Sequence, residues 1–164
     1  MDILWKNLFK KRNNNSISTI IKNVDLFNEL SKKQIKEIIN LGHVRNYKEN
    51  EIIFNKNEQS FGMFIILKGQ VEIYINKNNK KQIIDNYKQS EYFGEISLID
   101  KNIRKVNAIA KKETKLFYVF GEDFKELLNK NKDISILFYK NLTKNLIEKL
   151  INSFDAQEQQ QARV

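Results

Sequence analysis

The stretch from Phe93 to Arg104 holds the side chains best suited to bind an anionic ligand. Gly94 follows a short apolar run, Glu95 opens a segment typical of a helix of one or two turns, and Arg104 comes shortly afterwards. The first N–H groups of a helix have no partner inside the helix and attract anions. A carboxylate at this place repels a phosphate but accepts hydrogen bonds from neutral hydroxyls, such as those of a ribose. An arginine binds a phosphate through two parallel hydrogen bonds.

The choice of arginine at position 104 favours a geometric role for this side chain. Only four of the 29 basic residues are arginines and the others are lysines, so general surface charge does not explain an arginine here. The residues alone leave a second interpretation open, in which Glu95 and Arg104 form a salt bridge that closes the loop between them.

The elements that must position this stretch are predicted from the spacing of apolar residues. Short runs rich in Ile, Val, Phe and Tyr, separated by Asn, Lys and Gly, are typical of strands. We expect strands at 43–48, 51–54, 62–67, 70–76, 81–87, 106–111 and 115–120, and one that ends at 92–93. We expect helices at 17–23, 31–41, 95–99 and 122–154. Gly69 is placed for a tight hairpin turn, and Ser31 with Gln34 has the form of a capping box.

Together these elements predict a mainly β fold with flanking helices. The expected architecture is a jelly-roll-like antiparallel β-roll, or double-stranded β-helix, of about eight strands in two packed sheets. It carries N-terminal helices and a long C-terminal helix. The 164 residues fit one domain, with an amphipathic basic segment at 1–15, the domain with its C-terminal helix at 16–154 and a disordered tail at 155–164.

Composition argues against several classes of function. The chain has no cysteine and one histidine, His43, which we expect at the start of a strand. A disulfide framework, a metal site and a catalytic dyad are therefore not expected, and neither is an enzyme. The net charge of +9 comes mainly from lysines and is interpreted as a solvated surface, not as a site for a specific nucleic acid. Without a membrane-spanning run or a recognisable signal peptide, we expect a cytoplasmic protein.

Residues 1–12 place Trp5, Leu8 and Phe9 beside lysines and an arginine at helical spacing. Such a segment can lie on an anionic membrane surface, so weak peripheral membrane contact is one interpretation. The interpretation that we favour is that the segment docks onto the body of this protein or onto a partner.

The run Phe93-Gly-Glu-Ile-Ser-Leu-Ile-Asp-Lys-Asn-Ile-Arg-Lys-Val-Asn-Ala-Ile-Ala110 resembles the phosphate-binding cassette of cyclic nucleotide-binding domains. These are the β-roll modules of the cyclic AMP receptor protein and of protein kinase regulatory subunits. The resemblance covers about residues 24–150 and is most specific at residues 93–104, the cassette. A helix-turn-helix is not recognised after the long helix, so a DNA-binding regulator is not expected.

The resemblance implies a ligand site made by the cassette and its neighbour. The implied residues are Gly94, Glu95, Ile96, Ser97, Arg104 and Lys105. Glu95 is implied to accept a hydrogen bond from the ribose 2′-hydroxyl and Arg104 to bind phosphate, whereas Gly94 and Ile96 are implied to contact phosphate and ribose through the backbone. The chain departs from the family pattern at Ile103, Lys105 and Asn107, and the large charged side chain of Lys105 adds to the phosphate site or crowds it.

The resemblance also implies that an aromatic side chain of the C-terminal helix covers the bound base. The candidates are Phe138, Tyr139 and Phe154. The implied function is a regulatory sensor that binds cAMP or cGMP and thereby moves its C-terminal helix. The ligand expected first is cAMP, and no cofactor is expected. The alternative is a degenerate module that keeps the fold as a protein-interaction scaffold and binds no nucleotide.

A protein partner or a homodimer is expected through the C-terminal helix. Leu142, Leu146, Leu150 and Phe154 repeat every four residues and form an apolar stripe. This stripe is wider than the β-roll alone is expected to cover, which a second copy would explain. Folding of the stripe onto the roll as a lid explains the pattern equally well.

Overall fold

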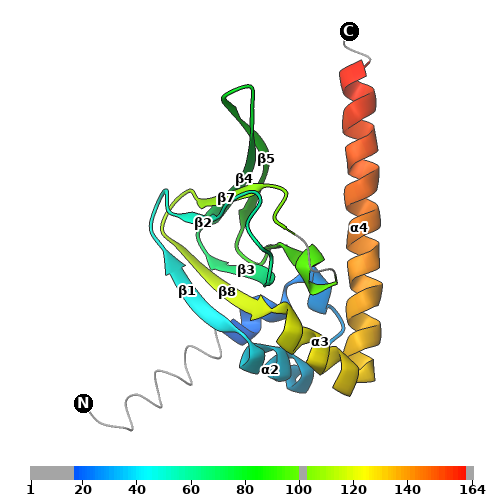
Figure 1. Cartoon of the computed structure of the whole chain (residues 1–164). Coiled ribbons are helices and arrows are strands. Elements are labelled where there is room, and N and C mark those ends of the chain that lie inside the picture. The colour runs from blue at the N-terminus through cyan, green and yellow to red at the C-terminus, as the bar shows by residue number, and fades with distance from the viewer. Residues whose placement is uncertain (1–16, 100–102, 162–164) are drawn as a thin grey trace, which may run out of the picture.

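The computed structural model describes residues 17–99 and 103–161, and there the chain runs from short helices through a β-roll to two further helices (Figure 1). The basic segment 1–15 lies outside the described residues, so the docking and membrane contacts expected of residues 1–12 stay predictions. The order of elements is the predicted one.

Eight strands form the roll. They are β1 His43–Tyr47, β2 Ile52–Phe54, β3 Gly62–Lys68, β4 Gln70–Lys77, β5 Lys80–Lys88, β6 Tyr92–Phe93, β7 Asn107–Ala110 and β8 Thr114–Phe120. They pair in two antiparallel four-stranded sheets, in the orders β1-β8-β3-β6 and β2-β7-β4-β5. The predicted antiparallel β-roll is therefore confirmed, and the predicted strands are present to within one residue at each end.

The hairpin turn predicted at Gly69 is wrong. Gly69 lies between β3 and β4, which belong to different sheets, so the chain passes from one sheet to the other at this residue. Its φ is +103°, and a Cβ there would lie 2.6 Å from the Cα of Thr114. Both the backbone conformation and the close approach therefore require glycine. The tight hairpin joins β4 and β5 instead, through Asn78 and Asn79 with φ of 52° and 58°.

Strand β3 contributes to two hydrophobic clusters because alternate side chains of a strand point to opposite faces. Met63 and Ile65 belong to the cluster formed with the helices. Phe64 and Ile66 belong to the cluster between the two sheets. All four side chains are buried, so this sheet is packed on both faces and holds the roll against its helices.

The N-terminal helices confirm the prediction closely. Residues 17–22 are helical, the short 3-10 helix η1 spans Asp25–Phe27, and α2 spans Lys32–Leu41. The predicted capping box is present, since the Gln34 N–H donates to Ser31 Oγ at 3.3 Å and the Ser31 N–H donates to Gln34 Oε1 at 2.8 Å. These two bonds satisfy N–H groups that have no partner within α2.

The C-terminal helix that we predicted at 122–154 is two helices, α3 Gly121–Lys130 and α4 Lys132–Gln161. The break falls at Asn131, whose φ of −124° and ψ of 96° are not helical. Its side-chain Oδ1 accepts the N–H of Ile134 at 3.2 Å and so caps the start of α4. The tail predicted as disordered from residue 155 is helical to Gln161, where α4 ends, and residues 162–164 lie outside the described residues.

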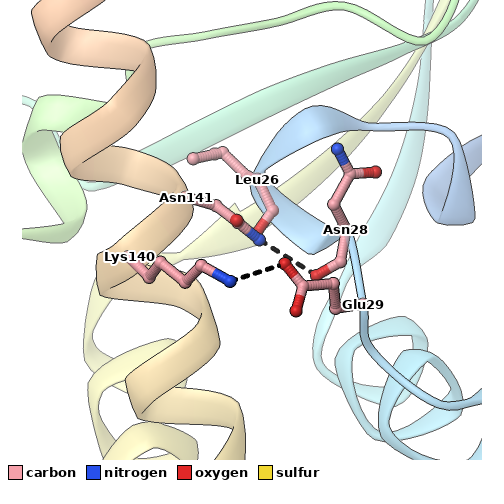
Figure 2. A network of polar contacts seen from close by, with 5 residues as sticks. All are labelled: Leu26, Asn28, Glu29, Lys140 and Asn141. Atoms are coloured by element: carbon pink, nitrogen blue, oxygen red, sulfur yellow. Dashed lines mark hydrogen bonds and ion pairs between the residues drawn. The ribbon is translucent and has the colours of Figure 1, made fainter.

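The first half of α4 is fastened to the N-terminal helices. Figure 2 shows Asn141 donating to the carbonyl oxygens of Leu26 and Asn28, at 3.3 and 3.0 Å, beside the ion pair of Lys140 with Glu29 at 2.8 Å. The second half of α4 runs alongside the roll and past it (Figure 1). The first half of α4 is therefore anchored to the N-terminal helices, whereas part of the surface of its second half is exposed.

Candidate ligand-binding site

The six residues implied by the cassette line one cavity, whose volume is about 360 Å³. The range 94–97 comes from the turn after β6 and from the 3-10 helix η2 (Glu95–Leu98). Arg104 and Lys105 come from the segment that precedes β7. The structure thus brings together all six of these residues, although η2 is one residue shorter than expected.

The apolar wall of the cavity comes from strands that the sequence did not single out. Phe54 of β2, Ile73 of β4 and Tyr87 of β5 face the cassette across the space. Tyr87 pairs with Val71, which lies between the sheets, and its ring centroid is 5.8 Å from that of Phe93. Strand alternation indicates which side chains share a face, but not which of them meet the cassette, because that depends on how the two sheets close.

Gly94 allows the chain to turn sharply beside Arg104. Its φ of 78° and ψ of 17° are left-handed, and a Cβ on this residue would lie 2.4 Å from Nη1 of Arg104. The Gly94 carbonyl oxygen accepts a hydrogen bond from the hydroxyl of Ser97, which closes the turn. Glycine is therefore needed both for the backbone conformation and for the arginine to reach its position.

Arg104 is held at the base of the cavity. Its Nη2 donates to the carbonyl oxygen of Gly62 at 2.8 Å, and its guanidinium carbon lies 4.2 Å from the centroid of the Phe54 ring. The side chain is buried, and burial lowers the pKa of Arg104 from its usual value. The N–H of Asn57 donates to its backbone oxygen, and its own N–H donates to the Glu58 oxygen, each at 2.8 Å. Contacts along both backbone and side chain thus fix this cation.

Glu95 and Arg104 do not form the salt bridge that the residues alone left open. Instead, Oε1 of the buried Glu95 lies 2.9 Å from Nζ of Lys149 on α4. Among the described residues, Arg104 has no ion pair with a carboxylate. The two cassette side chains therefore face the same cavity with opposite charges and form no ion pair with each other.

The departures from the family pattern occupy different places. Lys105 is exposed and lines the cavity, and so does the half-exposed Ile103. Asn107 is buried and holds the backbone instead, since its Oδ1 accepts the Lys56 N–H at 2.9 Å and its Nδ2 donates to the Tyr74 carbonyl oxygen at 3.1 Å. Of the three, only Lys105 brings a charge to the cavity.

The three aromatic residues predicted to cover a base do not line the cavity. Phe138 is fully buried and its ring lies 4.8 Å from that of Phe124, at 68°, so in this structure it is a core residue and does not face the cavity. Tyr139 and Phe154 are exposed on α4, away from the cavity wall. The residue of α4 that reaches the cassette is Lys149, which the sequence did not single out because its partner Glu95 is distant along the chain.

Alkaline pH is expected to destabilise the fold. Burial raises the pKa of Tyr92 to about 12, against 10.0 for a tyrosine free in solution, and burial raises the pKa of Tyr87 as well. Between pH 10 and 12 the unfolded chain has released a proton that folded Tyr92 keeps, so the free energy of unfolding falls as pH rises in this window. Thermal unfolding followed by circular dichroism should show Tm falling above about pH 10.

Phenylalanine variants identify the source of that fall. Tyr92→Phe should reduce the slope of Tm against pH, whereas Tyr139→Phe changes an exposed ring and should leave the slope as it is. Equal slopes for both variants and the parent would show that Tyr92 does not contribute.

The described residues carry neither a candidate membrane span nor a candidate metal site. Over the described ranges 17–99 and 103–161, no helix is both long and apolar enough to cross a membrane. In the same part of the chain, no three or more His, Cys, Asp or Glu side chains are grouped so that they could hold a metal ion. His43 lies at the start of β1, as predicted, and is exposed.

Sequence comparison finds relatives that share the cassette-bearing domain. The human cGMP-dependent protein kinase 2 is 29% identical over 92 residues, which are 55% of this chain and 12% of the kinase. The cyclic AMP receptor protein of Thermus thermophilus is 23% identical over 111 residues, 67% of this chain and 51% of that protein. The chain thus spans at most about half the length of these two relatives.

Structure comparison and a family model agree with this result. The catabolite activator protein of Thermus thermophilus has the same fold, with a TM-score of 0.73 at 22% identity over 82% of this chain and 62% of that one. The family model described as the cyclic nucleotide-binding domain matches residues 44–131, which include the whole cassette and most of the roll. By fold, by cassette and by this match, the chain belongs to the cyclic nucleotide-binding domain family.

Proposed function

We propose that this protein binds a cyclic nucleotide, with cAMP as the first candidate, in the cavity beside the cassette. The observation that carries the proposal is that Glu95 and Arg104 line one cavity without pairing with each other. A cyclic nucleotide carries an anionic phosphate and a neutral ribose hydroxyl on one ring system. Arg104 would bind the phosphate, with the backbone of Gly94 and Ile96, and Glu95 would accept the hydroxyl.

The cavity has the properties that such a ligand requires. Its volume of about 360 Å³ falls in the range of small-molecule sites, which combine apolar walls with a few placed polar groups. Tyr87 and Ile73 offer flat and apolar surface for a purine, while Ser97 and Lys105 offer further polar groups. The human relative is a cGMP-dependent protein kinase by name, so cGMP is the second candidate.

Calorimetric titration of the whole chain with cAMP and with cGMP tests the proposal. Binding of either nucleotide, with the linear 5′-monophosphate binding more weakly, is the expected result. Absence of heat at millimolar nucleotide would overturn it. The domain would then serve as a nucleotide-independent interaction scaffold, which is the alternative that the sequence leaves open.

We further propose that the module is regulatory and not enzymatic, and that the bound nucleotide changes the position of α4. Asn145 Nδ2 donates to the Tyr92 hydroxyl at 2.9 Å, and Lys149 pairs with Glu95, so α4 touches both β6 and the cassette. A ligand shifts the population between two positions of such a helix only by the difference between its affinities for the two positions. Amide hydrogen exchange along residues 132–155, with and without cAMP, measures the effect.

We propose a homodimer formed by the second half of α4. Leu142 is buried in the core, but the side chains beyond it are 42% to 56% exposed. These side chains are Leu146, Ile147, Leu150, Ile151 and Phe154. A contiguous apolar surface of this kind is typical of an interface. Light scattering at micromolar concentration should therefore give twice the monomer mass of 19.5 kDa.

A charge within the stripe provides the control for the dimer. Leu150→Lys should return the protein to 19.5 kDa without loss of nucleotide binding, because Leu150 does not line the cavity. A parent protein that is already monomeric at micromolar concentration would contradict the dimer.

A further inference from the structure

Lys149 reaches the cavity wall from outside. Its Nζ lies 2.9 Å from Oε1 of Glu95 and 5.3 Å from the centroid of the Tyr92 ring. The Glu95 side chain is 8% exposed and that of Lys149 is 44% exposed. A nearly buried carboxylate of the cassette thus takes its counter-ion from α4, a separate element that approaches from the solvent side.

The two oxygens of the Glu95 carboxylate have different surroundings. Oε1 accepts the hydrogen bond from Lys149, whereas Oε2 has no hydrogen-bond partner among the residues that the structure describes, and Glu95 lines the cavity. An ionised carboxylate accepts several hydrogen bonds at once. A ligand hydroxyl at Oε2 and the Lys149 ammonium at Oε1 can therefore be bound together.

Lys149 is the last of three polar contacts on one face of α4. Asn141, Asn145 and Lys149 are spaced by four residues and so lie above one another on the helix. Asn141 bonds to backbone oxygens near η1, and Asn145 bonds to the Tyr92 hydroxyl at 2.9 Å. Within the described residues, Lys149 is the member of this row whose partner lines the cavity.

We propose that Lys149 is a positioning residue that couples the ligand at Glu95 to the docked position of α4. This inference rests on the proposed function. A ligand in the cavity removes water from Glu95, which strengthens its attraction to Lys149, and the ligand's phosphate adds attraction for the same ammonium. Because the two equilibria are linked, docking of α4 raises the affinity for ligand, and ligand binding favours docking by the same factor.

The test compares variants of the full chain by calorimetry with cAMP and by amide exchange along α4. Lys149→Ala should weaken cAMP binding about fivefold and abolish the cAMP-dependent protection of residues 145–155. Lys149→Arg keeps the charge and should retain both properties. Lys140→Ala is the matched control, because it removes another ion pair of α4, with Glu29 at 2.8 Å, far from the residues that line the cavity, and it should bind cAMP like the parent.

A double-mutant cycle with Glu95→Gln identifies the pair itself. If the two residues act through each other, Lys149→Ala should change binding much less in the Glu95→Gln background than in the parent. Parent-like affinity and protection in Lys149→Ala would overturn the inference and leave the proposed function intact. Equal weakening by Lys140→Ala and Lys149→Ala would also overturn it, since α4 would then act only through general docking. A parent that binds neither cAMP nor cGMP overturns the proposed function, and the inference with it.

Discussion

Arg104→Ala is expected to weaken cyclic nucleotide binding by about 30- to 150-fold, which corresponds to about 2–3 kcal/mol. The guanidinium is buried and held by the Gly62 carbonyl oxygen and the Phe54 ring, so it is already placed for an anion and loses little freedom when one binds. Its truncation removes the buried guanidinium and leaves the exposed Lys105 as the cationic side chain in the cavity lining. Isothermal titration with cAMP measures the loss.

Two further variants decide whether geometry or charge is responsible. Arg104→Lys keeps the charge but cannot form two parallel hydrogen bonds, so it should recover only part of the affinity. Arg45→Ala removes an arginine that lies over the Tyr47 ring, outside the residues that line the cavity, and should leave binding unchanged. If Arg104→Ala bound cAMP as tightly as the parent, the assignment of the phosphate site to this residue would be wrong.

Phe138→Ala is expected to lower the free energy of unfolding by about 3–5 kcal/mol, because it leaves a cavity in the core. The Phe138 ring is fully buried and packs edge-on against Phe124, which in turn lies 6.3 Å from Phe27. Its removal therefore loosens the contact between α3, α4 and η1 at once. Urea unfolding followed by circular dichroism measures the change in the free energy of unfolding.

The neighbouring aromatic residue is the natural control for this variant. Tyr139→Ala truncates a side chain that is 45% exposed, and surface truncations change stability much less. A Phe138→Ala protein of parental stability with weakened cAMP binding would support the prediction that this residue covers the base. A large loss of stability in which the residual folded protein still binds cAMP would support its place in the core.

The cassette could be predicted because its chemistry is local. Gly94, Glu95 and Arg104 lie close together in the sequence, so their order and types already indicate a site for phosphate and ribose. The strands were predictable for the same reason, since each carries its alternation in its own residues. The capping box of Ser31 and Gln34 is a similar case, as both of its hydrogen bonds join residues three apart.

Features that depend on distant residues were not predictable. Phe138 and Lys149 both lie on α4, and nothing in their sequence shows that one enters the core and the other meets Glu95. Aromatic character suggested a cap at Phe138, but tertiary packing used that ring elsewhere. Gly69 suggested a hairpin because two strands flank it, and only the assignment of these strands to different sheets shows a crossing.

The break at Asn131 was missed because its flanking residues continue the helical pattern on both sides. A polar residue that ends one helix and caps the next is hard to distinguish from a polar residue on the solvent face of one long helix. In the structure, the Asn131 side chain accepts a hydrogen bond from the Ile134 N–H and so marks the start of a second helix.

In the proposed movement of α4, the same break would act as the fulcrum of a lever. Its 30 residues, at a rise of about 1.5 Å each, extend about 45 Å from the fulcrum at Asn131. Lys149 lies a little more than halfway along this arm, so a rigid rotation about Asn131 would displace the far end of α4 by about 1.7 times the displacement at the cassette. A rotation of about 10° would sweep that tip through about 8 Å. In the proposed movement of α4, the length of helix beyond Lys149 would therefore amplify small displacements beside Glu95.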